Sequence, residues 1–173
     1  MTASSVDQLD WFKKQFRPHF DEWVIGPINR LVTSQDALIG FIFMSCAIDY
    51  LAGFWWGKST NGDNKKSYID FIDTYFEPNK YDSNGLYDSL RNGLVHMFTI
   101  KGMKYALIHN RPEVHLKTGD KGQIIINAGN FRNELVAAKD KYFNDVEANS
   151  DLMDKIIDRI NRDGFLSVST IVI

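Results

Sequence analysis

Hydrophobic residues along most of this chain recur at steps of three and four, the spacing that places them on one stripe of an α-helix. Residues 86–102 show the pattern most clearly, because Leu86, Leu90 and Leu94 fall on one face. The same spacing predicts further helices over residues 6–16, 20–32, 35–57, 67–76, 131–146 and 151–162. We therefore expect a mainly α fold, a bundle of about five helices organised around residues 86–102.

Prolines and capping residues set the expected ends of these helices. Pro18 is expected to end or kink the first helix, because proline lacks an N–H donor and its ring clashes with the preceding turn. Pro27, after a glycine, is expected to interrupt the second helix. The aromatic-rich residues 1–33 should form a helical arm that packs into the core or forms a dimer surface. N-cap residues precede three later helices: Ser34, Ser83 and Asn130.

The hydrophobic period shortens to two after residue 102. Residues 104–109, 113–117 and 123–127 are short and rich in β-branched or aromatic side chains, with turn-forming residues between them. They predict a three-stranded antiparallel β-meander, inserted into the bundle over residues 103–128. Residues 165–173 also alternate, and they predict a strand against the meander or a dimer contact.

Residues 37–56 are apolar enough to span a membrane, and Asp49 is their single charge. A carboxylate well inside such a span would be costly in lipid. Ser45, Asp49 and Gly53 stand four residues apart, so they form a small, polar stripe on one face. This stripe favours the central helix of a bundle, facing another helix or a wet cleft, and we expect no membrane association.

Composition limits the classes of function. The 173 residues are 44% hydrophobic and carry a formal net charge of −2, so the chain lacks the basic surplus of proteins that coat nucleic acid. A single cysteine excludes a disulfide framework, and the first residues lack the pattern of a secretory signal, so a cytoplasmic protein is expected. His109 and His115 are too few to bind a metal, and no cofactor motif is found, so neither is expected.

The predicted helix over residues 86–102 carries the candidate chemistry. Asn92 and His96 are one turn apart, and Arg91 can reach the same spot. An imidazole can take the proton of an RNA 2′-OH near neutral pH, and a guanidinium can bind the phosphate that this hydroxyl attacks. The plain structural interpretation is that Arg91 pairs with Asp88 and that His96 makes a local hydrogen bond.

Arginine, a polar residue, three further residues and then histidine form the motif of HEPN domains, and residues 91–96 resemble it. The resemblance extends over residues 34–160 and implies a single HEPN-like domain. Its expected parts are an arm (1–33), core helices with the motif (34–102), the β insertion (103–128) and C-terminal helices with a tail (129–173). It also implies a homodimer in which two motifs face each other, and metal-independent endoribonuclease activity with Arg91, Asn92 and His96 as the catalytic residues.

Other interpretations of the motif remain open. The chain is alternatively a non-catalytic HEPN-like module that binds nucleotide or protein, or a helical protein outside the family. Asp49 needs a polar partner in its apolar helix. We hypothesise that it lies near the motif helix and orients Arg91 or sets the charge of His96, with Asp88 as a second supporting acid; a hydrogen bond to a tyrosine is the plainer alternative. Trp55 and Trp56 could stack a base or simply pack at the core rim.

Overall fold

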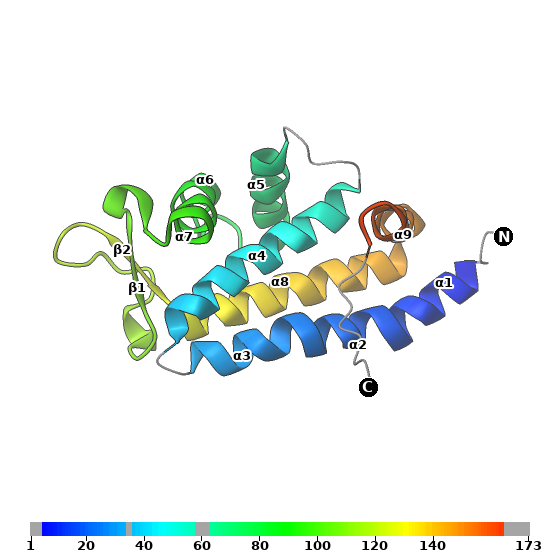
Figure 1. Cartoon of the computed structure of the whole chain (residues 1–173), viewed down its shortest axis with the longest axis horizontal. Coiled ribbons are helices and arrows are strands. Elements are labelled where there is room, and N and C mark those ends of the chain that lie inside the picture. Colours follow the sequence, from blue (N-terminus) through cyan, green and yellow to red (C-terminus); the bar gives the residue numbers. More distant parts are fainter. Residues whose placement is uncertain (1–4, 34–35, 58–62, 165–173) are drawn as a thin grey trace, which may run out of the picture.

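The computed structural model describes residues 5–33, 36–57 and 63–164, and it is mainly helical with a small two-stranded sheet at one end (Figure 1). The predicted helical fold class is confirmed at this level. Three long helical stretches run alongside one another: the N-terminal helices, α4 (Ala37–Trp56) and α8 (Ala128–Ala148). Packed across them are α5 (Asn64–Tyr75), η3 (Leu86–Arg91) with α7 (Asn92–Met97), and α9 (Ser150–Asp163). The predictions for Ser34 and for residues 165–173 concern residues outside this described part.

The predicted end of the helix at Pro18 and the predicted interruption at Pro27 are wrong. Helical structure continues through α1 (Ser5–Trp11), η1 (Phe12–Phe16), α2 (Arg17–Phe20), η2 (Asp21–Ile25) and α3 (Gly26–Val32). The segments η1 and η2 are π-helical, and each immediately precedes the residue before a proline. The wider π-turn, with its hydrogen bond spanning five residues, relieves the clash of the proline ring with the preceding turn and leaves the helix unbroken.

This N-terminal helix belongs to the core. Phe12, Phe16 and Phe20 are all at most 1% exposed. The ring of Phe143 on α8 (Ala128–Ala148) meets all three, with centroid separations of 5.3–5.7 Å. The described residues of the 1–33 arm therefore pack into the core, which is one of the two roles expected for it, and these three rings are unavailable for a dimer surface.

The predicted central helix is α4 (Ala37–Trp56), which contacts α3, α5 (Asn64–Tyr75), α8 and α9 (Ser150–Asp163). It is the one helix among the described residues that is long and apolar enough to cross a membrane, and 61% of its most apolar window is buried in the fold. The buried core helix of a protein outside the membrane can be equally long and apolar. Gly53 lies where a Cβ would come within 2.5 Å of the Arg159 guanidinium carbon, so the small residue lets α9 approach.

The motif helix is shorter than predicted and has an irregular middle. It comprises α6 (Ser83–Gly85), the π-helical η3 (Leu86–Arg91) and α7 (Asn92–Met97). Asp82 caps it in place of the expected Ser83, because the Asp82 carboxylate accepts the backbone N–H of Gly85. The helix ends at Phe98, whose φ of 53° is left-handed, and not at residue 102. A short 3-10 turn, η4 (Lys101–Met103), follows.

The expected antiparallel meander is wrong in direction and in strand number. The strands β1 (Tyr105–Ile108) and β2 (Ile124–Asn127) pair in parallel, with Tyr105 opposite Ile124. The expected middle strand is replaced by the 3-10 turn η5 (Pro112–Val114) and the residues after it, which leave one antiparallel bridge, from Thr118 to Ile124. The crossover between β1 and β2 turns the chain so that β2 leads directly into α8.

The C-terminal helices are close to the prediction. Asn127, rather than Asn130, caps α8, because its side chain accepts the backbone N–H of Asn130. Asn149 caps α9 in the same way, through the N–H of Asp151. The α9 helix ends at Gly164, which has a φ of 80°.

Candidate functional site

The motif helix lies against α4, with contacts from both η3 and α7. The π-helical turn of η3 ends at Arg91, and the N–H of Asn92 bonds to the carbonyl oxygen of Tyr87, five residues back. Single π-turns inside helices occur often at functional sites, because they re-aim the side chains around them. Here the last residue of the π-turn, Arg91, is the first residue of the motif, and its side chain reaches Asp49 of α4.

Asp49 and Arg91 form the ion pair that the sequence suggested. Arg91 Nη2 donates to Asp49 Oδ2 at 2.9 Å, and the two side chains are 16% and 31% exposed. The guanidinium carbon also lies 5.6 Å from the centre of the Tyr87 ring. The carboxylate of Asp49 is thus paired with a cation on the neighbouring helix, which offsets the free-energy cost of removing its charge from water.

The second arm of the guanidinium reaches the rest of the motif. Arg91 Nη1 lies 2.8 Å from His96 Nε2 and 3.2 Å from Asn92 Oδ1. A guanidinium can only donate, so His96 Nε2 accepts and carries no proton in this arrangement. His96 is exposed, whereas Asn92 is half-buried. We call Asp49, Arg91, Asn92 and His96 the Arg91 cluster.

Charge and burial act together around the Arg91 cluster. Burial alone would lower the pKa of Arg91, but the hydrogen bond and charge of Asp49 outweigh it and raise that pKa, so the guanidinium stays protonated. Burial and the Asp49 charge raise the pKa of the Cys46 thiol, and Arg91 partly opposes them. Burial and Asp49 likewise raise the pKa of Tyr68. The neighbouring thiol and phenol are therefore neutral near pH 7.

Asp88 does not pair with Arg91, contrary to the plain interpretation of the sequence. Both of its carboxylate oxygens lie 3.0 Å from Lys65 Nζ on α5. Lys65 also lies over the Tyr87 ring, at 5.7 Å. Asp88 is therefore outside the Arg91 cluster. Tyr87, which the sequence offers only as a hydrogen-bond partner for Asp49, lies under both cations, and its position four residues before Arg91 is the signal for that contact.

The other residues singled out from the sequence lie elsewhere. His115 Nδ1 accepts the backbone N–H of Asn127 at 3.1 Å, and its Nε2 lies 2.9 Å from the Tyr81 hydroxyl. His109 is exposed on the turn after β1. Trp55 and Trp56 are half-buried, with Trp55 packed edge-on against Tyr75. Within the described ranges no group of three or more His, Cys, Asp or Glu residues is placed to bind a metal ion.

Comparison of this chain with protein-family models, with curated proteins and with solved structures found no match. The likeness to HEPN domains therefore rests on the motif residues alone.

Proposed function

We propose that this chain is a HEPN-like protein that cleaves RNA in the cytoplasm without a metal ion, as a homodimer. One observation carries the proposal: the Arg91 guanidinium touches the unprotonated nitrogen of an exposed histidine, at 2.8 Å. A fixed cation and a base at one solvent-facing spot are the two groups that cleavage by the substrate's own 2′-OH requires.

The chemistry follows from these two groups. RNA phosphate displaces the Arg91–His96 hydrogen bond and takes the guanidinium N–H groups, which frees the Nε2 lone pair. His96 then removes the proton of the 2′-OH as that oxygen attacks phosphorus. The bond to the 5′-oxygen breaks, and this oxygen takes a proton from water, while the protonated His96 returns its own proton to solvent. The products are a 2′,3′-cyclic phosphate and a 5′-hydroxyl end. Asp49 holds Arg91 from the rear, and Asn92 fixes its second arm.

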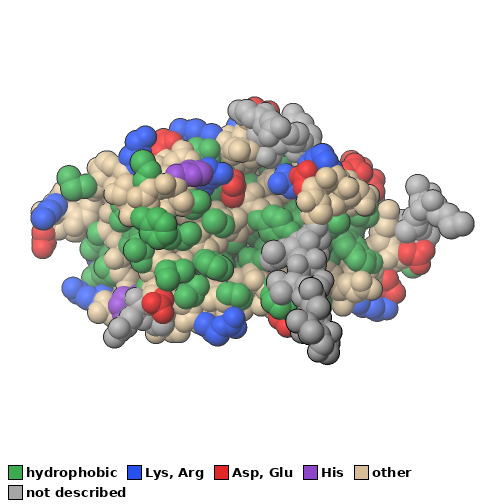
Figure 2. All heavy atoms as spheres, in the orientation of Figure 1, with side chains coloured by type: hydrophobic (Ala, Val, Ile, Leu, Met, Phe, Trp, Pro, Cys, Tyr) green, Lys and Arg blue, Asp and Glu red, His purple; other side chains and the backbone are tan. Residues whose placement is uncertain are grey.

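The surface beside the motif supports the homodimer. Met97, Phe98 and Met103 are 54%, 73% and 82% exposed, and the first two follow directly after His96. Phe98 and Met103 share a cavity of about 490 Å³ with Leu38 of α4. Figure 2 shows hydrophobic side chains gathered over α4 and the segments beside it. Large exposed apolar patches mark association sites, and a specific dimer buries at least about 1,000 Å².

The cleavage assay uses a mixed RNA pool in excess EDTA, with mapping of the end groups. His96→Ala and Arg91→Ala are each expected to slow cleavage by about 10²–10⁴-fold. His109→Ala is the matched control, because it removes an exposed histidine outside the cluster, and it should cleave at the wild-type rate. Cleavage by His96→Ala at the wild-type rate would show that the activity lies elsewhere.

Sedimentation tests the dimer separately. The wild type should sediment as a dimer at micromolar concentration, and Phe98→Asp should sediment as a monomer. Val6→Asp is the control, because Val6 is 72% exposed on α1 and far along the chain from the motif. A wild type that sediments as a monomer would contradict the proposed active site in which two motifs face each other across the dimer.

The second candidate function is a non-catalytic module that binds nucleotide or protein. The Asp49–Arg91 pair favours it, because a guanidinium already neutralised and only 16% exposed has less to offer a substrate phosphate. Under this alternative the EDTA assay shows no cleavage, whereas a fluorescent nucleotide binds with an affinity that Arg91→Ala weakens and His96→Ala leaves unchanged.

A further inference from the structure

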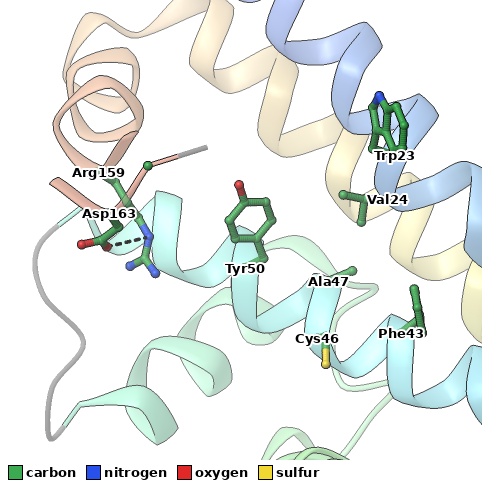
Figure 3. Close-up of a pocket in the computed structure, with 9 residues that line it drawn as sticks. Trp23, Val24, Phe43, Cys46, Ala47, Tyr50, Arg159 and Asp163 are labelled. Atoms are coloured by element: carbon green, nitrogen blue, oxygen red, sulfur yellow. Dashed lines mark ion pairs between the residues drawn. The ribbon is translucent and has the colours of Figure 1, made fainter. Parts of the chain in front are cut away.

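A second apolar surface lies on the side of α4 that faces the N-terminal helix and α9. It is a groove of about 540 Å³, which we call the α4–α9 groove. Trp23 and Phe43, on its walls, are 38% and 45% exposed. Figure 3 shows these side chains at one end of the groove and the Arg159–Asp163 ion pair at the other. The groove is lined by Trp23, Val24, Phe43, Cys46, Ala47, Tyr50, Arg159, Asp163 and Gly164.

The polar end of the groove has a spare donor. Arg162 takes both carboxylate oxygens of Asp163, at 3.0 and 3.2 Å, and leaves Arg159 only a 3.6 Å ion pair through Nε. Considering only the described residues, Arg159 Nη1 is buried without a hydrogen-bond partner. A buried N–H without a partner is costly, so the Arg159 side chain would gain by shifting toward the groove to donate to a carbonyl oxygen that an occupant brings there.

The described chain ends at the groove itself. Gly164 is the last described residue and one of the groove's lining residues. Its φ of 80° belongs to the left-handed region, where glycine is favoured, and it ends α9 there. Nine residues follow, FLSVSTIVI, which are uncharged, largely apolar and β-branched. Such a segment gains free energy by leaving water, and the nearest exposed apolar surface lies where it begins.

Residues 165–173 are long enough to span the groove, and their backbone offers the hydrogen-bond acceptors that its polar end lacks. Nine extended residues span about 30 Å, whereas Tyr50 and Phe43, at the two ends of the α4 wall, are about 10 Å apart along the helix. An extended segment also presents backbone carbonyl groups, which suit the spare donor of Arg159. We propose that residues 165–173 of the same chain lie in the α4–α9 groove and cover Phe43 and Trp23. This inference does not depend on the proposed ribonuclease activity.

The single cysteine provides the test, because Cys46 lines the groove. A second cysteine is introduced as Ser167→Cys or Val168→Cys, two neighbours that point to opposite sides of an extended chain. After mild oxidation at low micromolar concentration, at least one variant should form a disulfide with Cys46 within the same chain. Disulfide formation requires the two Cα atoms to approach within about 7 Å. Mass spectrometry of proteolytic fragments and non-reducing electrophoresis identify the linkage.

Ser150→Cys is the matched control, because Ser150 begins α9 and lines a different cavity, with Val6 and Leu9 of α1. It should form no disulfide with Cys46. Disulfide-linked dimers as the main product of the tail variants would place the segment on a second copy and overturn the proposal. Absence of any disulfide to Cys46 in both tail variants would overturn it as well.

A chain ending at Gly164 gives an independent readout. If its circular dichroism is that of the wild type, it should bind an apolar fluorescent dye several-fold more strongly, because Phe43 and Trp23 are uncovered. Phe43→Ser in this shortened chain should reverse most of the increase. Equal dye binding by the full and shortened chains would contradict the proposal, and the disulfide test decides if the shortened chain does not fold.

Discussion

Gly93, within the motif, should tolerate no side chain. A Cβ at this position would lie 2.4 Å from the carbonyl oxygen of Thr99 and 3.1 Å from the backbone nitrogen of Lys101. The close approach exists because the chain turns sharply after Phe98: the Thr99 N–H bonds back to the Gly93 carbonyl oxygen at 3.1 Å. Both obstructing atoms belong to the backbone, so Gly93→Ala can be accommodated only if this turn moves.

The magnitude follows from that distance. Moving the oxygen from 2.4 Å to an ordinary contact of 3.4 Å requires a backbone shift of about 1 Å. Overpacking of this kind costs about 1–3 kcal/mol, and loss of the hydrogen bond between Thr99 and Gly93 adds about 1 kcal/mol. The better helix propensity of alanine returns about 1 kcal/mol. We expect Gly93→Ala to lower the free energy of unfolding by about 1–3 kcal/mol.

Urea denaturation measures this difference. Gly129→Ala is the control, because Gly129 is also helical but its Cβ would meet only the Asn127 side-chain oxygen, at 3.3 Å. It should leave stability unchanged or raise it by up to about 1 kcal/mol. The reasoning is refuted if Gly93→Ala is as stable as Gly129→Ala, since residues 93–99 would then not form this tight turn.

Three further predictions concern single side chains. Burial lowers the pKa of His115, and Lys80 has a smaller effect in the same direction, so the unfolded chain binds the proton more tightly than the folded chain does. The free energy of unfolding should therefore be at its full value above about pH 6.5 and should fall as the pH drops below it. In urea titrations at pH 7.5 and 5.5, His115→Asn should lose this dependence; equal pH dependence of the two proteins would contradict the prediction. Phe98→Gly should be more stable than Phe98→Ala by up to about 1 kcal/mol, because both variants lose the ring that the proposed dimer would bury and only glycine relieves the left-handed φ of 53°. Asp49→Asn should lower the free energy of unfolding by about 1 kcal/mol, the value of a partly exposed charged hydrogen bond. If the lost interaction is the one with Arg91, the double variant Asp49→Asn with Arg91→Ala will be no less stable than Arg91→Ala alone. Additive losses in the double variant would contradict this.

The pattern of hydrophobic residues predicts the helices, and the cost of burying the Asp49 charge predicts that Asp49 has a polar partner. The repeat of Leu86, Leu90 and Leu94 placed the motif helix, and all three side chains are at most 1% exposed. Asp49 was expected to need a partner, because a lone charge in an apolar helix is costly. That argument placed Arg91 among the candidate partners, beside His96 and two tyrosines, and the structure shows that Arg91 is the partner.

Other features cannot be predicted from the spacing of hydrophobic residues along the chain. An alternating pattern identifies strands but not their direction, so β1 and β2 were expected to be antiparallel and are parallel. Pro18 is expected to disrupt its helix, but the π-turn that ends at Phe16 keeps the helix continuous, and such a turn has no sequence signature. Asp88 was assigned to Arg91 by spacing along the helix, but Lys65 on α5 is its partner. In each case a neighbour distant in sequence, or a local backbone choice, decided the outcome.

The Asp49–Arg91 pair sets the condition that any function of the motif must meet. In the free protein Arg91 makes hydrogen bonds to Asp49, Asn92 and His96, so no binding partner meets an empty guanidinium. A phosphate can replace the neutral His96 acceptor at little cost, because it offers a charged acceptor, and charge-assisted hydrogen bonds are about twice as strong as neutral ones. Replacing Asp49 would expose an unpaired carboxylate and is unfavourable. The phosphate should therefore enter from the exposed His96 side, which brings the substrate beside the imidazole nitrogen that must accept its proton.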